Sequence, residues 1–114
     1  PPSPTEQITE LLDRYAAALE SRSLDALKRI WPGLSGAQES AMRYEFQNAR
    51  LIEAEVVSPQ ISLRGETATV TFTRRYRNVT VDGQDLRRDS SATMTVRQAG
   101  NAWVIEQLRF APAR

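Results

Sequence analysis

The stretch Gly65–Arg97, GETATVTFTRRYRNVTVDGQDLRRDSSATMTVR, consists of two alternating runs around a turn at Asp82-Gly83. Alternation of apolar and polar residues is typical of a strand that is buried on one face. The side chains on this face are Val70, Phe72, Arg74 and Tyr76 in the first run, and Arg88, Ser90, Ala92, Met94 and Val96 in the second. The sequence therefore predicts a long antiparallel hairpin with one face toward a core or cavity and one polar face.

The register of this hairpin follows from the side-chain pattern. A two-residue Asp82-Gly83 loop, the usual interpretation of that dipeptide, would turn the apolar side chains of the second run to the threonine side. Because a slip of one residue changes the face of every side chain, the pattern outweighs the dipeptide. We predict an odd-numbered loop centred on Gly83. This register gives the cross-strand pairs Phe72–Met94, Val70–Val96 and, on the outer face, Arg77–Asp89.

The composition excludes several kinds of chemistry. The chain of 114 residues is long enough for one domain with a core. It has no cysteine and no histidine, which excludes disulfides, thiolate or imidazole metal sites, cysteine nucleophiles and Ser-His-Asp triads. A net charge of +1 gives no electrostatic case for nucleic acid, and no apolar run is long enough for membrane insertion. We predict no metal site and no cofactor.

Three helices are predicted before the hairpin, over about residues 4–21, 24–31 and 36–47. Ser3 is the expected N-cap of the first, with Pro4 at the first helical position and Glu6 completing a capping box. Ser23 is the expected cap of the second helix, and Ser35 repeats the capping-box spacing at the third. We interpret residues 1–4 as the end of a proline-rich linker and residues 5–112 as a single domain of a longer protein.

After the third helix the hydrophobic period changes to two. Strands are predicted over Arg50–Ser58 and Gln60–Arg64, separated by Pro59, and the last strand over Ala102–Phe110. The last strand carries apolar residues on both faces, so its facing stays open. Helices followed by antiparallel strands indicate an α+β fold, with the helices on one face of a curved sheet.

The sequence resembles nuclear transport factor 2-like domains, a superfamily that includes SnoaL-like and ketosteroid-isomerase-like enzymes. The similar segments are Ile8–Glu20 and Ser23–Leu27 at the opening of the domain and Asn101–Leu108 at its last strand. Trp31–Ser35, Phe46–Arg50 and Gly65–Val70 resemble a narrower group at the C-terminal end of bacterial membrane proteins, often serine/threonine kinases. The resemblance implies a cystatin-like cone, in which the sheet curls around the first helix and leaves a pocket at its open end.

The resemblance leaves three functions open. The leading hypothesis is a non-catalytic accessory domain of a larger bacterial protein that binds a small ligand in the cone or a protein partner, for sensing or assembly. Its expected partners are a small molecule, a parent polypeptide such as a kinase, and a second copy in a weak homodimer. Such a domain is extracytoplasmic if a membrane span precedes it and otherwise cytoplasmic. The alternatives are a small acid/base enzyme (isomerase, dehydratase or cyclase) and a purely structural module.

Tyr15 is the candidate for catalysis in the enzyme hypothesis. It lies where ketosteroid-isomerase-like members carry an oxyanion-stabilising tyrosine. Those enzymes also use a base that follows the second helix, and here that region has no carboxylate before Glu39. We therefore expect Tyr15 to be an aromatic residue of the helix stripe, with its hydroxyl at the rim of the pocket.

Further pocket candidates come from the sheet and the helices. Arg74 and Arg88 fall on the apolar side of the hairpin, where they could recognise an anionic ligand. We expect instead that both extend into solvent at the strand ends. Glu106 and Gln107 alternate on the last strand, so either could face the cavity. The aromatic and sulfur-containing candidates, expected in the core and partly lining a small cavity, are Trp31, Phe46, Tyr76, Met94 and Trp103. The outer-face charges Arg75, Arg77, Arg87, Asp89 and Arg97 form either a docking patch or a solvated surface.

Overall fold

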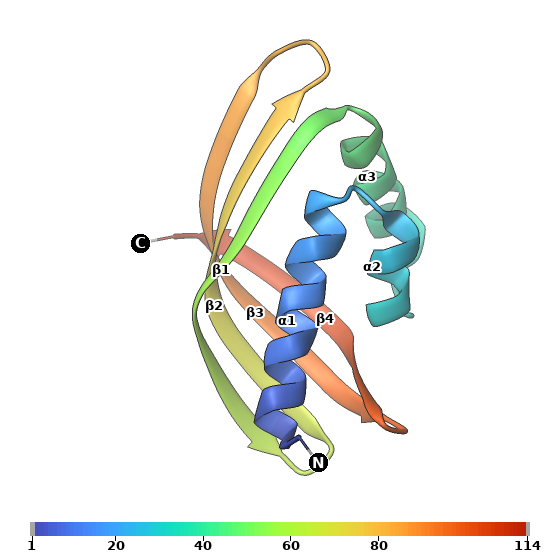
Figure 1. Cartoon of the computed structure of the whole chain (residues 1–114), viewed down its shortest axis with the longest axis vertical. Helices are drawn as coiled ribbons and strands as arrows, with labels where there is room; N and C mark the ends of the chain where they lie inside the picture. The colour runs from blue at the N-terminus through green and yellow to red at the C-terminus, as the bar shows by residue number, and fades with distance from the viewer. Residues whose placement is uncertain (1, 114) are drawn as a thin grey trace.

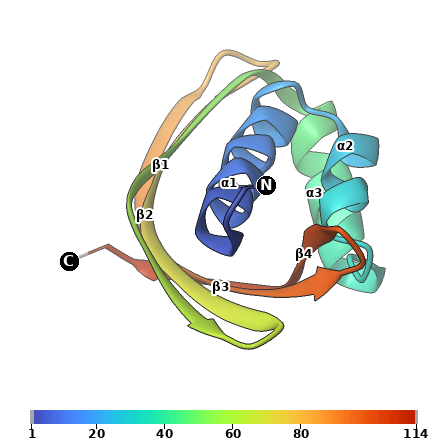
Figure 2. The same ribbon diagram turned by 60° about the horizontal axis from the view of Figure 1, so that its bottom comes forward.

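The structure, a computed structural model, describes residues 2–113 and contains three helices followed by one four-stranded sheet (Figure 1). The elements are α1 (Pro4–Glu20), α2 (Leu24–Ile30), α3 (Gly36–Gln47), β1 (Ala49–Arg64), β2 (Thr67–Thr80), β3 (Asp85–Ala99) and β4 (Ala102–Pro112). The sheet is antiparallel in the order β1-β2-β3-β4 and curls around α1, with α2 and α3 beside it (Figure 2). The predicted α+β fold is confirmed. Pro1, the first residue of the predicted linker, lies outside the described residues.

The core lies between α1 and the concave face of the sheet. Apolar residues at helical spacing on α1, such as Ile8 and Leu12, are buried against alternate residues of the hairpin, such as Val70 and Met94. No helix within residues 2–113 has the length and apolar character needed to cross a membrane.

The end of α1 also covers the edge of the sheet. The backbone N–H groups of Arg22 and Ser23 reach back to the carbonyls of Leu19 and Ala18, the hydrogen-bond pattern of a Schellman cap. Such a cap favours glycine, yet Arg22 adopts it with a φ of 52°. Its guanidinium donates a hydrogen bond to the backbone carbonyl of Arg50 at 2.6 Å, an interaction that glycine could not make.

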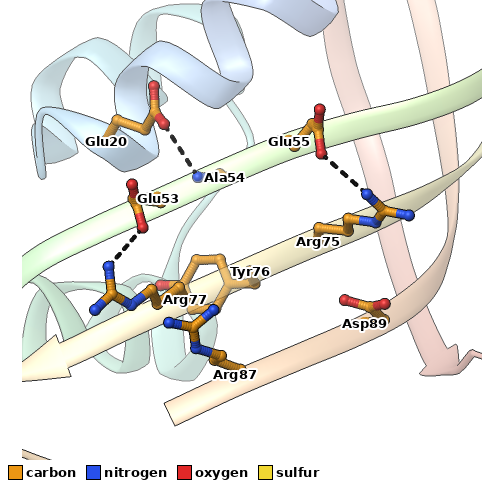
Figure 3. A pocket seen from close by; sticks show the side chains of 9 residues that line it. All are labelled: Glu20, Glu53, Ala54, Glu55, Arg75, Tyr76, Arg77, Arg87 and Asp89. Atoms are coloured by element: carbon orange, nitrogen blue, oxygen red, sulfur yellow. Dashed lines mark hydrogen bonds and ion pairs between the residues drawn. The ribbon is translucent and has the colours of Figure 1, made fainter. Parts of the chain in front are cut away.

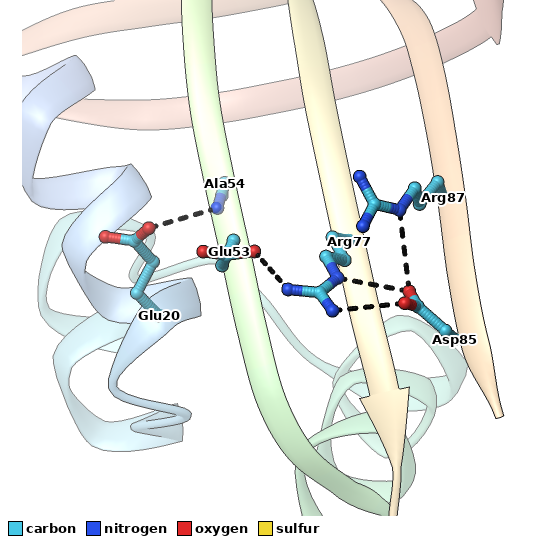
Figure 4. Close-up of polar contacts among 6 residues, drawn as sticks. All are labelled: Glu20, Glu53, Ala54, Arg77, Asp85 and Arg87. Carbon is cyan, nitrogen blue, oxygen red and sulfur yellow. Dashed lines mark hydrogen bonds and ion pairs between the residues drawn. The ribbon is translucent and has the colours of Figure 1, made fainter. Parts of the chain in front are cut away.

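Glu20 makes a second contact with the same edge. Its carboxylate accepts a hydrogen bond from the backbone N–H of Ala54 at 3.2 Å (Figure 4). Together with Arg22, side chains from the end of α1 thus satisfy both a donor and an acceptor of the edge strand β1.

The hairpin has the predicted faces but not the predicted register. Val70 pairs with Met94 and Phe72 with Ala92, two residues away from the expected pairs. The loop is odd-numbered but is centred on Asp82 rather than Gly83. The N–H of Gly83 donates to the Thr80 carbonyl at 3.0 Å, and Gly83 takes the last loop position with a φ of 92°.

A register shift of two residues leaves each side chain on the same face of the sheet but changes the residue that lies opposite it on the next strand. On the outer face Arg77 therefore lies opposite Arg87, not Asp89, and Asp89 lies opposite Arg75.

Two local expectations about the ends of elements are wrong. The predicted break at Pro59 is a register shift inside one continuous strand, β1, where Ser58 has a φ of 53°. Ser35 makes no side-chain capping bond, because Gly36 directly after it has a left-handed φ of 62°. The caps predicted at Ser3 and Ser23 are present, accepting from the N–H groups three residues on.

The facing of β4 is determined by a register shift opposite Thr95 and Val96. Ile105 pairs with Val96, and after the shift Leu108 pairs with Met94, so both face the core although their sequence parity differs. Phe110 follows Leu108 onto the concave face, opposite Ala92.

Candidate functional site

Arg74 is the centre of the candidate site, on the concave face of β2. Its guanidinium carbon lies 4.3 Å from the centroid of the Tyr76 ring and 4.1 Å from that of Phe110. Its Nη1 donates a hydrogen bond to the Tyr15 hydroxyl at 3.1 Å. Three elements thus surround one cation: α1 through Tyr15, β2 through Tyr76, and β4 through Phe110, which the register shift turns inward.

The charge of Arg74 has no carboxylate partner among residues 2–113. The side chain is half-buried, and its Nε–H is buried without a hydrogen-bond acceptor. A guanidinium carries five N–H donors, so a single tyrosine hydroxyl leaves most of them free. The aromatic rings offset part of the cost of burying the charge. An anion that accepts hydrogen bonds from the remaining N–H donors would offset more of it.

Glu45 supplies a carboxylate close to this cluster. It comes from α3 and accepts a hydrogen bond from the Tyr76 hydroxyl. Burial and this bond to Glu45 raise the pKa of Tyr76 above its ordinary value. Burial also raises the pKa of Tyr15, against the opposing effect of Arg74. Both tyrosines are therefore neutral hydrogen-bonding groups near pH 7 and not bases.

Two hollows meet at Arg74. The first, which we call the mouth groove, has a volume of about 450 Å³ and is lined by Glu45, Arg74, Tyr76, Asn78, Asp85, Leu86, Arg87 and Arg88. The second, the inner cavity, has a volume of about 60 Å³ and is lined by Tyr15, Leu19, Leu27, Trp31, Gln38, Met42, Arg74, Leu108 and Phe110. Arg74 is the residue that lines both, so its side chain separates a polar groove from a mostly apolar cavity.

The structure brings together half of the predicted pocket residues. Tyr15 and Trp31 line the inner cavity, Tyr76 and Arg88 line the mouth groove, and Arg74 lines both. Arg88 is exposed at the rim, whereas Arg74 is held inward. Arg88 therefore extends into solvent at the end of its strand, whereas Arg74, on the same face, is placed where it could contact a ligand.

The other predicted pocket residues lie away from these hollows. Phe46 and Met94 are buried in the core and line neither hollow. The indole N–H of Trp103 donates to Gln7 at 3.0 Å, near the start of α1, about 12 Å along the helix from Tyr15.

Glu106 and Gln107 do not face the cavity. The register shift between Ile105 and Leu108 turns both side chains outward, and both are exposed. Glu106 pairs with Arg97 on the outer face, with 3.6 Å between the charged atoms. An acid/base mechanism that combines Tyr15 with Glu106 is therefore wrong.

Sequence reasoning missed Glu45, Asn78 and Phe110. Asn78 is 8% exposed, and its Oδ1 is buried without a partner beside the mouth groove. The signal for Glu45 was its spacing of three residues from Met42 on α3, which places both on the face toward the sheet. No local signal marked Phe110, since its facing depends on a shift in pairing.

On the outer face of the hairpin, Arg77 and Arg75 form ion pairs with carboxylates of β1 (Figure 3). Arg77 bridges Glu53 at 2.9 Å and Asp85 at 3.1 Å (Figure 4). The hydrogen bonds from Arg77 lower the pKa of Asp85. Arg75 pairs more loosely with Glu55, at 3.7 Å. The paired residues Glu53, Arg77, Glu55 and Arg75 line an open hollow of about 480 Å³, which is a solvated network of ion pairs rather than a basic patch.

No group of three or more carboxylates in the described part of the chain is arranged to hold a metal ion. The chemistry that the cluster at Arg74 offers is binding of an anion by a pre-positioned guanidinium, with neutral tyrosines beside it.

No protein-family model and no curated protein matches the sequence. Solved structures do match. A dehydratase candidate of the NTF2-like family from Streptomyces avermitilis superposes with a TM-score of 0.83 at 18% identity, over 96% of this chain and 97% of that chain. A protein with a cystatin-like fold from Caulobacter vibrioides gives 0.77 at 17% identity, over 96% and 89% of the two chains.

The hub of the S. rosetta kinase CaMKII has a TM-score of 0.75 at 21% identity, over 99% of both chains. At these identities the comparisons show the fold. The chain has the nuclear transport factor 2-like, or cystatin-like, fold, as the sequence resemblance implied.

Proposed function

We propose that this domain is a non-catalytic binding module that takes a small anionic ligand, with a carboxylate as the simplest case, at the mouth of its cone. The observation that carries this proposal is Arg74, a half-buried cation held by Tyr15, Tyr76 and Phe110 without a carboxylate partner among residues 2–113. Arg88 adds a second positive charge at the rim of the same groove. A carboxylate that reaches Arg74 gains a charge-assisted hydrogen bond in a partly desolvated site.

The same domain would act as an accessory part of a larger protein, for sensing or assembly. The similarity of its fold to a CaMKII hub supports a role within an assembly. The outer face supports only weak self-association, because its charges already pair with one another and threonines cover much of the rest.

A second candidate function is acid/base catalysis with Glu45, in place of the expected Glu106. The hydrogen bond between Glu45 and Tyr76 favours it, because it places a carboxylate beside the cone pocket. Against it, the bond occupies the carboxylate, and the raised pKa of Tyr15 and Tyr76 leaves both tyrosines protonated.

The test is a titration of the intact domain with acetate, butanoate and hexanoate, in which calorimetry and amide chemical shifts measure the binding. We expect saturable binding that Arg74→Leu weakens at least about tenfold, because a hydrogen bond to a charged group contributes about 1.5–3 kcal/mol. The matched control is Arg75→Leu, the next residue on the strand, whose side chain points to the outer face.

The neutral amides of the same acids should bind much more weakly than the acids. Equal binding of acids and amides, or an equal loss in the Arg75→Leu variant, would show that Arg74 does not recognise an anion.

A further inference from the structure

The inner cavity lies directly behind the guanidinium of Arg74, on the side away from the mouth groove. Its walls are apolar side chains from all three helices and from β4: Leu19, Leu27, Trp31, Met42, Leu108 and Phe110. The polar groups at its boundary are Arg74, the Tyr15 hydroxyl and Gln38. A charged site and an apolar cavity therefore share one side chain.

We propose that the ligand is a short amphipathic carboxylate, with its head on Arg74 and its apolar tail in the inner cavity. This inference rests on the proposed function, since it needs an anion at Arg74. It adds a second subsite, the inner cavity, for the apolar tail of the ligand. An anion could bind Arg74 without using this cavity.

The volume of the inner cavity limits the tail. A cavity of about 60 Å³ holds about two water-sized groups, taking about 30 Å³ for each. A methylene is close to a water molecule in size, so the buried part of the tail is an unbranched segment of about two carbons.

The tail can enter without unfolding of the core. Met42 is half-buried, Gln38 is exposed, and Phe110 is 42% exposed, so the side of the cavity between α3 and the end of β4 borders on solvent. A head group bound to Arg74 next to Phe110 is beside this opening.

The experiment measures affinity along a series of carboxylates: acetate, butanoate, hexanoate and decanoate. We expect binding to tighten about fourfold for each added methylene, as far as about butanoate, and to stop improving by hexanoate. Met42→Trp, which fills the cavity, should remove the gain in affinity along the series. Met42→Ala, which enlarges the cavity, should extend the gain to longer chains.

The matched control is Tyr44→Ala on the same helix, because Tyr44 is 70% exposed and lines neither hollow. Thermal unfolding of each variant shows that it is folded at the temperature of the titration. Acetate binding that depends on Arg74 with no gain for butanoate would overturn the tail subsite and leave the proposed function intact.

A gain that continues through decanoate and survives in Met42→Trp would also overturn it, because the tail would then lie on the surface. Failure of every carboxylate to bind would overturn the proposed function itself.

Discussion

Arg74 and Arg77 lie three residues apart on β2 but on opposite faces of the sheet. Arg77 is fixed by two carboxylates, Glu53 and Asp85, in a network that is complete within the domain. Arg74 is fixed by two aromatic rings and one hydroxyl, none of which carries a charge. The position of an arginine is therefore a poor guide to its role, and the charge of its partners is the informative feature.

The largest expected contrast between the two faces concerns packing. Phe72 is 5% exposed on the concave face, and Thr71 is exposed beside it on the outer face. We expect Phe72→Ala to lower the free energy of unfolding by about 3–5 kcal/mol, because it leaves a cavity in the core. Thr71→Ala should change it by less than about 0.5 kcal/mol. Urea denaturation measures both, and similar losses would show that the faces are misassigned.

The second contrast is in the pH dependence of stability. The pKa of Tyr76 is raised in the folded state above its ordinary value of 10.0, mainly by burial. The neutral form therefore stabilises the fold fully below pH 10, and this contribution is lost as the pH rises above that value. We expect Tyr76→Phe to reduce the alkaline loss of stability, measured by chemical denaturation at a series of pH values.

The outer face should respond at the opposite end of the pH scale. Its Asp85 has a pKa below the ordinary value of 3.8 because Arg77 donates hydrogen bonds to it. That contribution is present above pH 3.8 and is lost as the pH falls through the lowered pKa. Asp85→Asn is the control: it should flatten the acid limb and leave the alkaline limb unchanged. Equal effects of both variants on both limbs would contradict the division between the faces.

The smallest contrast is in the stability cost of removing each charge. We expect Arg74→Met to change the free energy of unfolding by no more than about 1 kcal/mol, because a half-buried charge without a counterion is replaced by an apolar chain. Arg77→Met should lower it, since Glu53 and Asp85 would lose the cation between them. Denaturation in low and high salt separates the two, because salt should reduce only the second effect.

Most features that depend on neighbouring residues in the chain were predicted well, the cap at Ser35 and the break at Pro59 being the exceptions. The helix starts at Ser3 and Ser23 and the faces of the hairpin follow from spacing of two to four residues, and the structure has them. The face on which Arg74 lies is of this kind, but its guanidinium bonds to Tyr15 instead of extending into solvent as we expected.

Features that depend on pairing between strands were not predictable in the same way. The hairpin register depends on which loop position Gly83 occupies, and two odd-numbered loops give the same faces. The facing of Phe110 depends on a shift in the partner strand, which leaves no mark on its own sequence pattern. Phe110 therefore became visible as a residue of the candidate site only when the strands were placed in space, whereas Glu45 had a local signal in its spacing from Met42.

The contacts between the end of α1 and β1 have a consequence for how copies of this domain tolerate crowding. An uncovered strand edge is a template on which other polypeptides can add strands and begin to aggregate. Glu20 and Arg22 occupy that template on the first half of β1, from the same helix end whose left-handed turn lacks the usual glycine. The left-handed turn at Arg22 thus combines an unfavourable backbone conformation with a side-chain contact that covers part of an edge on which other chains could pair.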